Sequence, residues 1–173
     1  MNKLQPKDSR KIEDWVKHLE SVVLFNGLKS NKEALRAFAE NMEERIFAPN
    51  SKIIVEGEAS TELFILISGE ASVFKRTPEG DSYKVANLSA KQHAFFGEGG
   101  LISSETRSAT ITSNSDCHCL VLNGQHFETL SQKYPQWAMP FYRQIAGLVL
   151  SRLRKTNTDL MLLYNALVAE IRG

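Results

Sequence analysis

Short runs of β-branched, aliphatic and aromatic residues fill the middle of the sequence, from Arg45 to Leu122. Turn residues separate these runs, among them Gly57, Gly69 and the Pro-Glu-Gly-Asp stretch at 78–81. Runs of this kind predict β-strands, and many short strands at close spacing predict a β-barrel or a jelly roll. The expected strands cover residues 52–55, 63–67, 71–74, 83–88, 109–112 and 119–122.

Two helices are predicted before this β-rich region. Apolar residues recur at helical spacing over about residues 9–27, and a glycine ends that stretch. Ser30 followed by Glu33 forms a capping box, which predicts the start of a second helix that continues through Met42. Residues 1–44 are therefore expected to be an N-terminal helical segment, and the β-barrel is expected to begin at residue 45.

The residues after the β-rich region, 123–173, are predicted to be helical. Asn123 is a good N-cap for a short helix that ends near Tyr134. A long helix follows Pro135 nearly to the end of the sequence, with Pro140 either opening it or kinking its first turns. No linker rich in Pro, Gly or Ser separates the segments, so we expect a single domain.

The long helix carries an apolar seam. The members of the seam lie alternately three and four residues apart, and the one polar member is a threonine. The seam either packs on the barrel of its own chain or forms a parallel coiled coil in a homodimer. We favour the homodimer, because the seam is longer than the barrel needs. Its members are Ala146, Val149, Leu153, Thr156, Leu160, Leu163 and Leu167.

Charge and composition exclude several classes of function. Lys and Arg total 21 and Asp and Glu total 20, and the resulting net charge of +1 provides no basic field for a nucleic-acid backbone. No apolar stretch is long enough to cross a membrane, and the N-terminus lacks the apolar core of a secretory signal. We expect a cytoplasmic protein that binds neither nucleic acid nor membranes.

The two cysteines, Cys117 and Cys119, are predicted to be free thiols. They lie two residues apart in a predicted strand, so both side chains point to one face at a spacing poorly suited to a disulfide. His118 points to the opposite face, so these three side chains cannot easily hold one metal ion. We expect two buried thiols and no metal site.

The segment Phe96–Ile111 is the candidate functional site. Its three glycines allow a ligand to approach the backbone, and a short helix that begins near Gly99 would direct free N–H groups toward a phosphate. Arg107 adds a permanent positive charge and Ser108 a hydroxyl donor for the same phosphate. Glu98 only accepts hydrogen bonds when ionised, so it suits a ribose hydroxyl. A ribose beside a phosphate satisfies all of these groups.

This segment resembles the phosphate-binding cassette of the cyclic nucleotide-binding domain family. The resemblance rests on Phe-Gly-Glu at 96–98, Leu-Ile at 101–102 and Arg-Ser-Ala-Thr at 107–110, and it extends upstream to residues 54–58 and 63–69. It implies a mainly β fold with flanking α-helices. That fold is an eight-stranded jelly-roll β-barrel, or double-stranded β-helix, with N-terminal helices and a long C-terminal helix. It also implies that a cyclic purine nucleotide lies under the cassette and that the ligand moves the C-terminal helix.

The resemblance also implies roles for single residues. Glu98 would bind the ribose 2′-hydroxyl, and Arg107 and Ser108 would bind the cyclic phosphate. In the catabolite-activator branch, the long helix presents a threonine and a small polar residue to the purine, and Thr156 with Asn157 resembles that pair; alternatively, Thr156 only sets the register of the seam. The implied ligand-binding residues are Phe96, Gly97, Glu98, Gly99, Gly100, Leu101, Arg107, Ser108, Ala109, Thr156 and Asn157.

Two positions depart from the family pattern. The stretch 89–93, Ser-Ala-Lys-Gln-His, stands where the family usually has a glycine turn. Gly99 stands where a larger aliphatic residue is common. Both departures bear on the shape of the pocket, and neither removes Glu98 or Arg107.

These features predict a cytoplasmic receptor or regulatory module that signals through its C-terminal helix. cAMP is favoured over cGMP, because cGMP readers of the family often carry threonine at the position of Ser108. No nucleophile lies beside a base in a recognisable turn, so we do not expect an enzyme or a cofactor. No helix-turn-helix unit follows the long helix, so the output is expected to pass through dimerisation or an unidentified protein partner. The alternative is a barrel that has lost its ligand and serves as an interaction or dimerisation scaffold.

Overall fold

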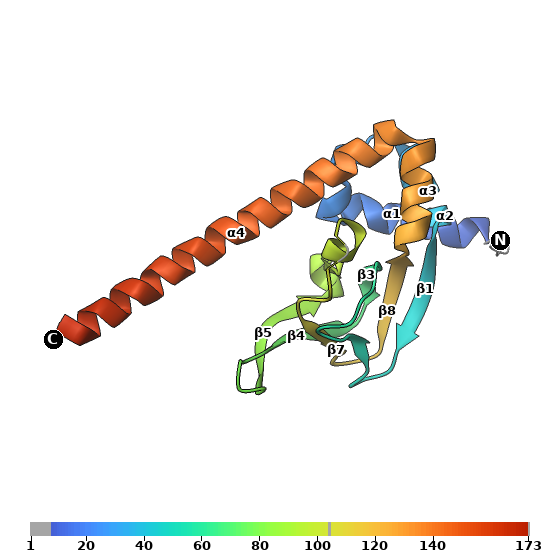
Figure 1. Ribbon diagram of the computed structural model, residues 1–173. Helices are drawn as coiled ribbons and strands as arrows, with labels where there is room; N and C mark the ends of the chain where they lie inside the picture. The colour runs from blue at the N-terminus through green and yellow to red at the C-terminus, as the bar shows by residue number, and fades with distance from the viewer. Residues whose placement is uncertain (1–7, 104, 173) are drawn as a thin grey trace.

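The computed structural model describes residues 8–103 and 105–172, and within them eight strands form two antiparallel sheets of four strands each (Figure 1). The first sheet has the order β1 (Met42–Phe47), β8 (Cys117–Leu122), β3 (Leu63–Ser68) and β6 (Phe95–Phe96). The second has the order β2 (Lys52–Ile54), β7 (Thr110–Ser113), β4 (Glu70–Arg76) and β5 (Ser82–Ser89). The jelly-roll fold with N-terminal helices and a long C-terminal helix is confirmed, as a roll of two sheets rather than a closed barrel. Predictions for residues 1–7, Ser104 and Gly173 lie outside the described residues.

Strands β1 and β6 are not among the strands expected from the sequence. β1 carries charged residues at 43–45, which hide its strand pattern, and it pairs with β8 along its whole length, from Met42 opposite Leu122 to Phe47 opposite Cys117. β6 is two residues long and pairs only with β3. Because its pairing comes from a strand distant in sequence, no local pattern marks it.

The first sheet is buried on both faces. Leu63 and Ile65 of β3 pack against the helices, whereas Phe64 and Leu66 point into the roll. The rings of Phe64 and Phe96 stack there with their centroids 5.3 Å apart. Burial on both faces explains why β3 is a continuous apolar run rather than an alternating one.

The cysteines of β8 are free and buried, as expected. Both Cys117 and Cys119 face the interior of the roll, and the Cys117 Sγ donates to the carbonyl oxygen of Glu70 at 3.1 Å. Burial raises the pKa of both thiols, and it raises the pKa of Cys119 to about 12. The thiolate form that reacts with electrophiles is therefore suppressed at both positions.

We expect neither cysteine to react with Ellman's reagent in the folded protein near pH 8, because both thiols are buried and protonated there. The control is the same protein unfolded in guanidinium chloride, in which both thiols should react within minutes. Rapid release of one equivalent of thiolate from the folded protein would contradict the burial of this strand.

The N-terminal helices differ from the prediction. The helix expected over 9–27 ends early: α1 covers Ser9–Ser21, and a 3-10 helix, η1, covers Val23–Leu28. The buried residues explain the break. A continued α-helix would bury the positions of Asn26 and Gly27, whereas the structure buries Leu24, Phe25 and Leu28.

The second helix, α2, covers Lys32–Glu40 and is capped by Asn31 rather than by the predicted Ser30. The Asn31 side chain accepts from the backbone N–H of Ala34 at 3.0 Å. The predicted continuation through Met42 is also wrong, because Met42 is buried as the first residue of β1. Pairing with β8 overrides the helical pattern at that position.

The C-terminal helices follow the prediction. α3 covers Gly124–Lys133, and the side chain of its N-cap, Asn123, accepts from the N–H of Gln125. α4 covers Pro135–Arg172 and continues through Pro140. The first turns of α4 are anchored in an aromatic cluster, where Phe141 contacts Phe25, Phe38 and Phe127.

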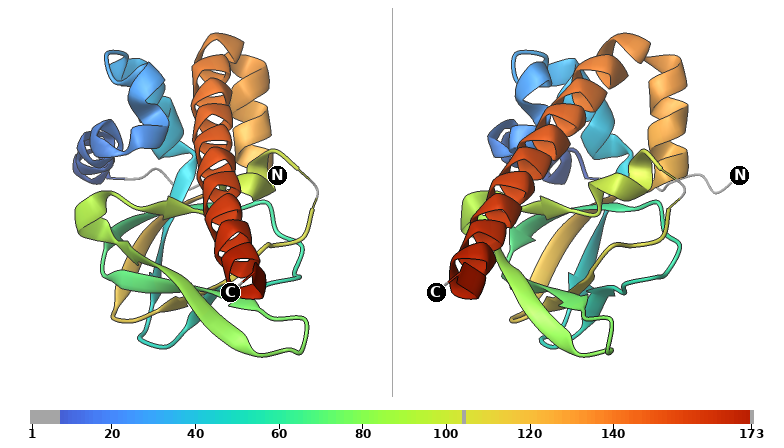
Figure 2. Two further views of the ribbon diagram at one scale, coloured as in Figure 1. Left: turned by 90° about the vertical axis from the view of Figure 1, so that its left-hand side faces the viewer. Right: turned by 60° about the vertical axis from the view of Figure 1, so that its left-hand side comes forward.

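The rest of α4 projects beyond the roll (Figures 1 and 2). Its 38 residues make a helix about 57 Å long. From Leu150 to Leu167 every side chain is exposed, so the seam residues from Leu153 to Leu167 do not pack on the barrel of their own chain.

The turn before the cassette contains no glycine, yet it adopts a conformation that favours one. A 3-10 turn, η2, covers Ala90–Gln92, and His93 follows it with φ of 50° in the left-handed region. His93 thus occupies the backbone position that a glycine commonly takes. The ring of His93 contacts the ring of His18 edge-on, with the centroids 5.5 Å apart.

Candidate functional site

A cavity of about 460 Å³ lies inside the roll, between the cassette and α4. One wall is apolar and comes from strands of both sheets, with Val73, Leu88 and Phe95 among its residues. The other wall is more polar and comes from the segment 97–109. The cavity therefore fits a ligand with one apolar end and one polar or charged end.

The polar wall begins at a tight glycine turn. The expected short helix is a 3-10 turn, η3, which covers Glu98–Leu101 and follows Gly97 in the left-handed region at φ of 81°. A Cβ on Gly97 would lie 2.7 Å from the Glu62 carbonyl oxygen and 2.9 Å from Arg107 Nη1. Nothing lies within 4 Å of a Cβ on Gly99. Gly97 is therefore required by both conformation and space, whereas Gly99 is not.

We expect Gly97→Ala to lower the free energy of unfolding by about 1–3 kcal/mol, because the left-handed backbone and the crowded Cβ both oppose it. Urea unfolding monitored by tryptophan fluorescence measures this change. Gly99→Ala is the matched control, two residues away in the same turn, and should change stability by less than about 0.5 kcal/mol. Equal effects of the two substitutions would contradict this geometry.

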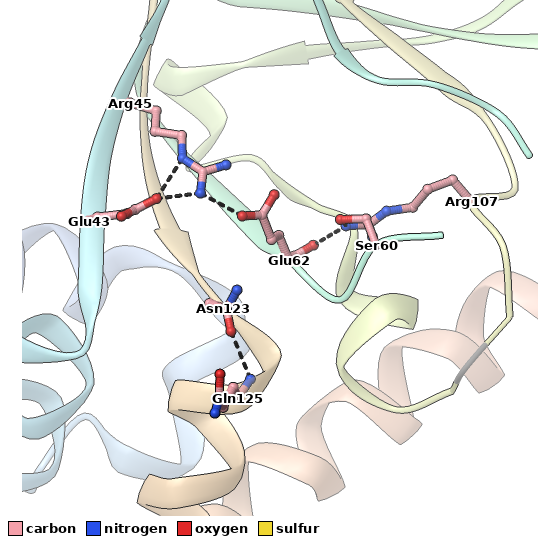
Figure 3. A network of polar contacts seen from close by, with 7 residues as sticks. All are labelled: Glu43, Arg45, Ser60, Glu62, Arg107, Asn123 and Gln125. Carbon is pink, nitrogen blue, oxygen red and sulfur yellow. Dashed lines mark hydrogen bonds and ion pairs between the residues drawn. The ribbon is translucent and has the colours of Figure 1, made fainter. Parts of the chain in front are cut away.

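Arg107 lies behind this turn and is 6% exposed. Its Nη1 donates to the Gly97 carbonyl at 2.8 Å. Its Nη2 donates to the Ser60 hydroxyl at 2.9 Å and to the Glu62 carbonyl at 2.6 Å (Figure 3). Its Nε–H is buried without a partner among the described residues. All three bonded acceptors are neutral, so no carboxylate within the described chain neutralises this guanidinium by a hydrogen bond.

Burial lowers the pKa of Arg107, and the nearby charges of Glu62 and Glu98 raise it in part. The side chain stays charged at neutral pH, since arginine keeps its proton even when it is buried. A buried cation held by neutral acceptors at the wall of a cavity favours an anionic ligand.

Glu98 is the acidic residue of the turn and is 8% exposed. Its carboxylate forms an ion pair with Arg152, which lies on α4 and is more than half exposed. Arg152 also lies over the ring of Phe95, 5.9 Å from the centroid. Through this arginine and Val149, α4 closes one side of the cavity.

The fold and this geometry agree with comparisons to known proteins. The sequence matches the profile described as "Cyclic nucleotide-binding domain" over residues 44–134, more than half of its 173 residues. The chain belongs to the cyclic nucleotide-binding domain family.

The chain is similar to a protein kinase regulatory subunit, a catabolite activator protein and a cyclic nucleotide-binding domain. The chain is 34% identical over 112 residues to the "cAMP-dependent protein kinase regulatory subunit" of Yarrowia lipolytica, covering 65% of this chain and 28% of that protein. Among solved structures, the Thermus thermophilus catabolite activator protein matches with a TM-score of 0.70 and 26% identity, covering 82% of this chain and 62% of that chain. A cyclic nucleotide-binding domain from Methylobacillus flagellatus matches with a TM-score of 0.74 and 20% identity, covering 88% of this chain and 83% of that chain, and supports the fold. The chain therefore spans less than a third of the length of that kinase regulatory subunit and about three fifths of the catabolite activator protein.

The structure brings most residues of the predicted cassette to the cavity wall. Leu101 is an exception, because it packs against the helical core instead of lining the cavity. Thr156 and Asn157 are exposed on α4 beyond the cavity, and the Thr156 hydroxyl donates to the Arg152 carbonyl at 3.1 Å. A role for these two residues in binding stays a prediction. The predicted residues that line the cavity are Phe96, Gly97, Glu98, Gly99, Gly100, Arg107, Ser108 and Ala109.

The contacts that hold Arg107 and Glu98 are not predicted from the sequence. Ser60 and Glu62 lie some 45 residues before Arg107, and their contacts with it depend on the folded turn. Arg152 belongs to a cluster of basic residues on a helix, which is more often a solvated face than part of a site. One local signal marked it: Val149 and Arg152 are three residues apart and therefore share a helix face.

No group of three or more metal-ligating side chains occurs in residues 8–103 and 105–172. None of the helices in the described part of the chain is long and apolar enough to cross a membrane.

Proposed function

We propose that the chain is a cytoplasmic cyclic nucleotide receptor, with cAMP favoured over cGMP, and that it has a regulatory rather than a catalytic role. The observation that carries the proposal is the buried guanidinium of Arg107, which neutral acceptors hold at the wall of a cavity beside Glu98. A cyclic nucleotide offers an anion and a hydroxyl at the spacing that such a pair can bind. The preference for cAMP rests on Ser108 and on the cAMP-dependent relative.

In this proposal the two walls of the cavity bind the two ends of the nucleotide. Arg107 and Ser108 bind the cyclic phosphate by charge-assisted and hydroxyl hydrogen bonds. The Glu98 carboxylate accepts a hydrogen bond from the ribose 2′-hydroxyl. The apolar wall, with Val73, Leu88 and Phe95, covers the purine.

The ion pair between Glu98 and Arg152 connects the site to α4. A ribose hydroxyl that bonds to Glu98 competes with Arg152 for the same carboxylate. Ligand binding then weakens the hold of the cassette on the middle of α4, and this change is the proposed output. The helix can shift only by as much as the ligand's affinity differs between its two positions.

Arg152→Gln is expected to raise the affinity for cAMP about threefold, because Glu98 is freed from a competing partner that is itself mostly solvated. Calorimetry measures the affinity, and hydrogen exchange near Val149 should become fast in the variant without nucleotide. Arg154→Gln, an exposed arginine two residues away, is the control. Weaker binding in Arg152→Gln would mean that Arg152 holds the ligand rather than competing with it.

The exposed half of α4 is proposed to form a parallel homodimer with a second copy of the chain. Leu153, Leu160 and Leu163 are 54%, 62% and 69% exposed, which is costly for large aliphatic side chains on one helix. Sedimentation velocity with and without cAMP tests the dimer. A monomer at all concentrations would overturn this part of the proposal.

Calorimetric titration of the purified protein with cAMP and with cGMP tests the receptor function. We expect saturable binding of both nucleotides, with cAMP binding more tightly. If neither cAMP nor cGMP bound, the proposed receptor function would be refuted. The exposed seam of α4 would then favour the alternative function of a dimerisation or interaction scaffold.

A further inference from the structure

Glu62 contacts two different arginines through two different groups (Figure 3). Its main-chain oxygen accepts from Arg107 Nη2 at 2.6 Å. Its carboxylate Oε1 accepts from Arg45 Nη2 at 2.5 Å, and Arg45 lies on β1 rather than in the cassette. Glu62 therefore connects an arginine outside the cavity to the arginine at the cavity wall.

Arg45 is fixed on its other side as well. Its Nε donates to the Glu43 carboxylate at 2.6 Å, and its Nη2 bonds to the same carboxylate. The Glu62 side chain is 20% exposed and that of Arg45 is 38% exposed, so their contact is better shielded from water than most surface ion pairs. Two carboxylates on one guanidinium hold it in a single orientation.

The orientation of the Glu62 carboxylate matters for Arg107. Figure 3 shows this carboxylate turned toward Arg45, while the carbonyl oxygen of the same residue points to Arg107. The two charges still interact, since Glu62 raises the pKa of Arg107. Without Arg45, the carboxylate is free to turn to the Arg107 guanidinium, which lacks a bonded anion among the described residues. A carboxylate in that place competes with any anionic ligand.

We propose that Arg45 is a positioning residue of the anion site: by pairing with the Glu62 carboxylate, it keeps that carboxylate off Arg107 and leaves the guanidinium charge available to the phosphate. This inference rests on the proposed role of Arg107 as the phosphate ligand. Arg45 itself does not line the cavity. Its effect on binding passes entirely through Glu62.

The test compares single and double variants by calorimetry with cAMP. Arg45→Met is expected to weaken binding about tenfold, because the released Glu62 carboxylate occupies Arg107. Adding Glu62→Gln should restore the affinity to within about threefold of the wild type, because a neutral amide competes poorly with a phosphate for a guanidinium. Arg45→Lys keeps the positive charge and should also stay within about threefold.

Arg36→Met is the matched control. Arg36 also pairs with two carboxylates, Glu13 and Glu40, at a similar exposure of 42%, but it lies on α2 away from the cavity. Its loss should leave the affinity unchanged. If Arg45→Met does not fold, Arg45→Gln replaces it in the test, because its amide is also neutral. Arg45→Gln should then bind cAMP more weakly than Arg45→Lys does.

A second measurement does not need the nucleotide. The side-chain ¹⁵N–¹H signals of Arg107, assigned by their loss in Arg107→Lys, are expected to shift in Arg45→Met and to return in the double variant. If the wild type bound neither cAMP nor cGMP, the proposed receptor function would fail, while these shifts would still support the positioning role. The positioning role would be overturned if the double variant bound cAMP as weakly as Arg45→Met does. It would also be overturned if Arg45→Met kept wild-type affinity and unchanged Arg107 signals.

Discussion

Replacing Arg107 with alanine is expected to weaken cAMP binding by about one to two orders of magnitude, which corresponds to a charge-assisted interaction of roughly 1.5–3 kcal/mol. Arg107 lines the cavity, and its buried guanidinium donates hydrogen bonds only to neutral acceptors, so no bonded carboxylate offsets its charge. Its removal also takes the Arg107 donor from the Glu62 carbonyl, whereas the Gly97 carbonyl still accepts from the backbone N–H of Gly100 at 3.1 Å. Calorimetric titration with cAMP measures the loss.

A lysine at this position separates the effect of charge from that of geometry, and a second variant elsewhere is the control. Arg107→Lys keeps the charge but cannot reach the three acceptors at Gly97, Ser60 and Glu62 together, so we expect a loss of about tenfold. Arg10→Ala, at an exposed position on α1, is the control for the loss of one positive charge. Wild-type affinity in Arg107→Ala would refute the assignment of the phosphate to this cassette.

Phe141→Ala is expected to lower the free energy of unfolding by about 3–5 kcal/mol, the largest stability effect that we predict. Phe141 is fully buried where α4 joins the N-terminal helices. Its ring centroid lies 5.2 Å from that of Phe25, 4.9 Å from that of Phe38 and 5.0 Å from that of Phe127. Three other elements therefore lose a packing partner, and the large cavity left behind cannot collapse without moving α4. Urea unfolding measures the change.

Met139→Ala, two residues before Phe141 in the same helix, is the control. Met139 is 69% exposed, so its truncation should cost less than about 0.5 kcal/mol. If both substitutions had equally small effects, α4 would not be anchored by the aromatic cluster. Contacts other than those of Phe141 would then have to fix the first turns of α4, from which its distal part projects.

Residue patterns predict the structure correctly where residues close in sequence determine it. The six predicted strands lie in place, because alternating or continuous apolar runs between turn residues mark strands in any context. Asn123 caps α3 as predicted, since a cap depends on a few neighbouring residues. The glycines, Glu98 and Arg107 of the cassette are likewise close in sequence, so one segment brings them to one wall of the cavity.

Residue patterns mispredict secondary structure where contacts with a segment distant in sequence determine it. Met42 has the spacing of the preceding helix, but its pairing with Leu122 makes it a strand residue. The α1 pattern continues past Ser21, but burial of Leu24 and Phe25 under α4 requires a new helical phase. Helical spacing reports only that a face is apolar, and it does not report which surface will cover that face.

The sequence by itself determined the cassette and, through it, the family. Its glycines, its acid and its arginine all lie within residues 97–107, and a pattern confined to one short segment is visible in a single chain. Only the tertiary structure decided what holds those groups. Ser60 and Glu62 support Arg107, Arg45 holds the Glu62 carboxylate, and Arg152 pairs with Glu98 from α4. These partners come from elements 17 to 54 residues away in sequence. Contacts over such separations arise from the packing of whole elements, which no local pattern of residues encodes.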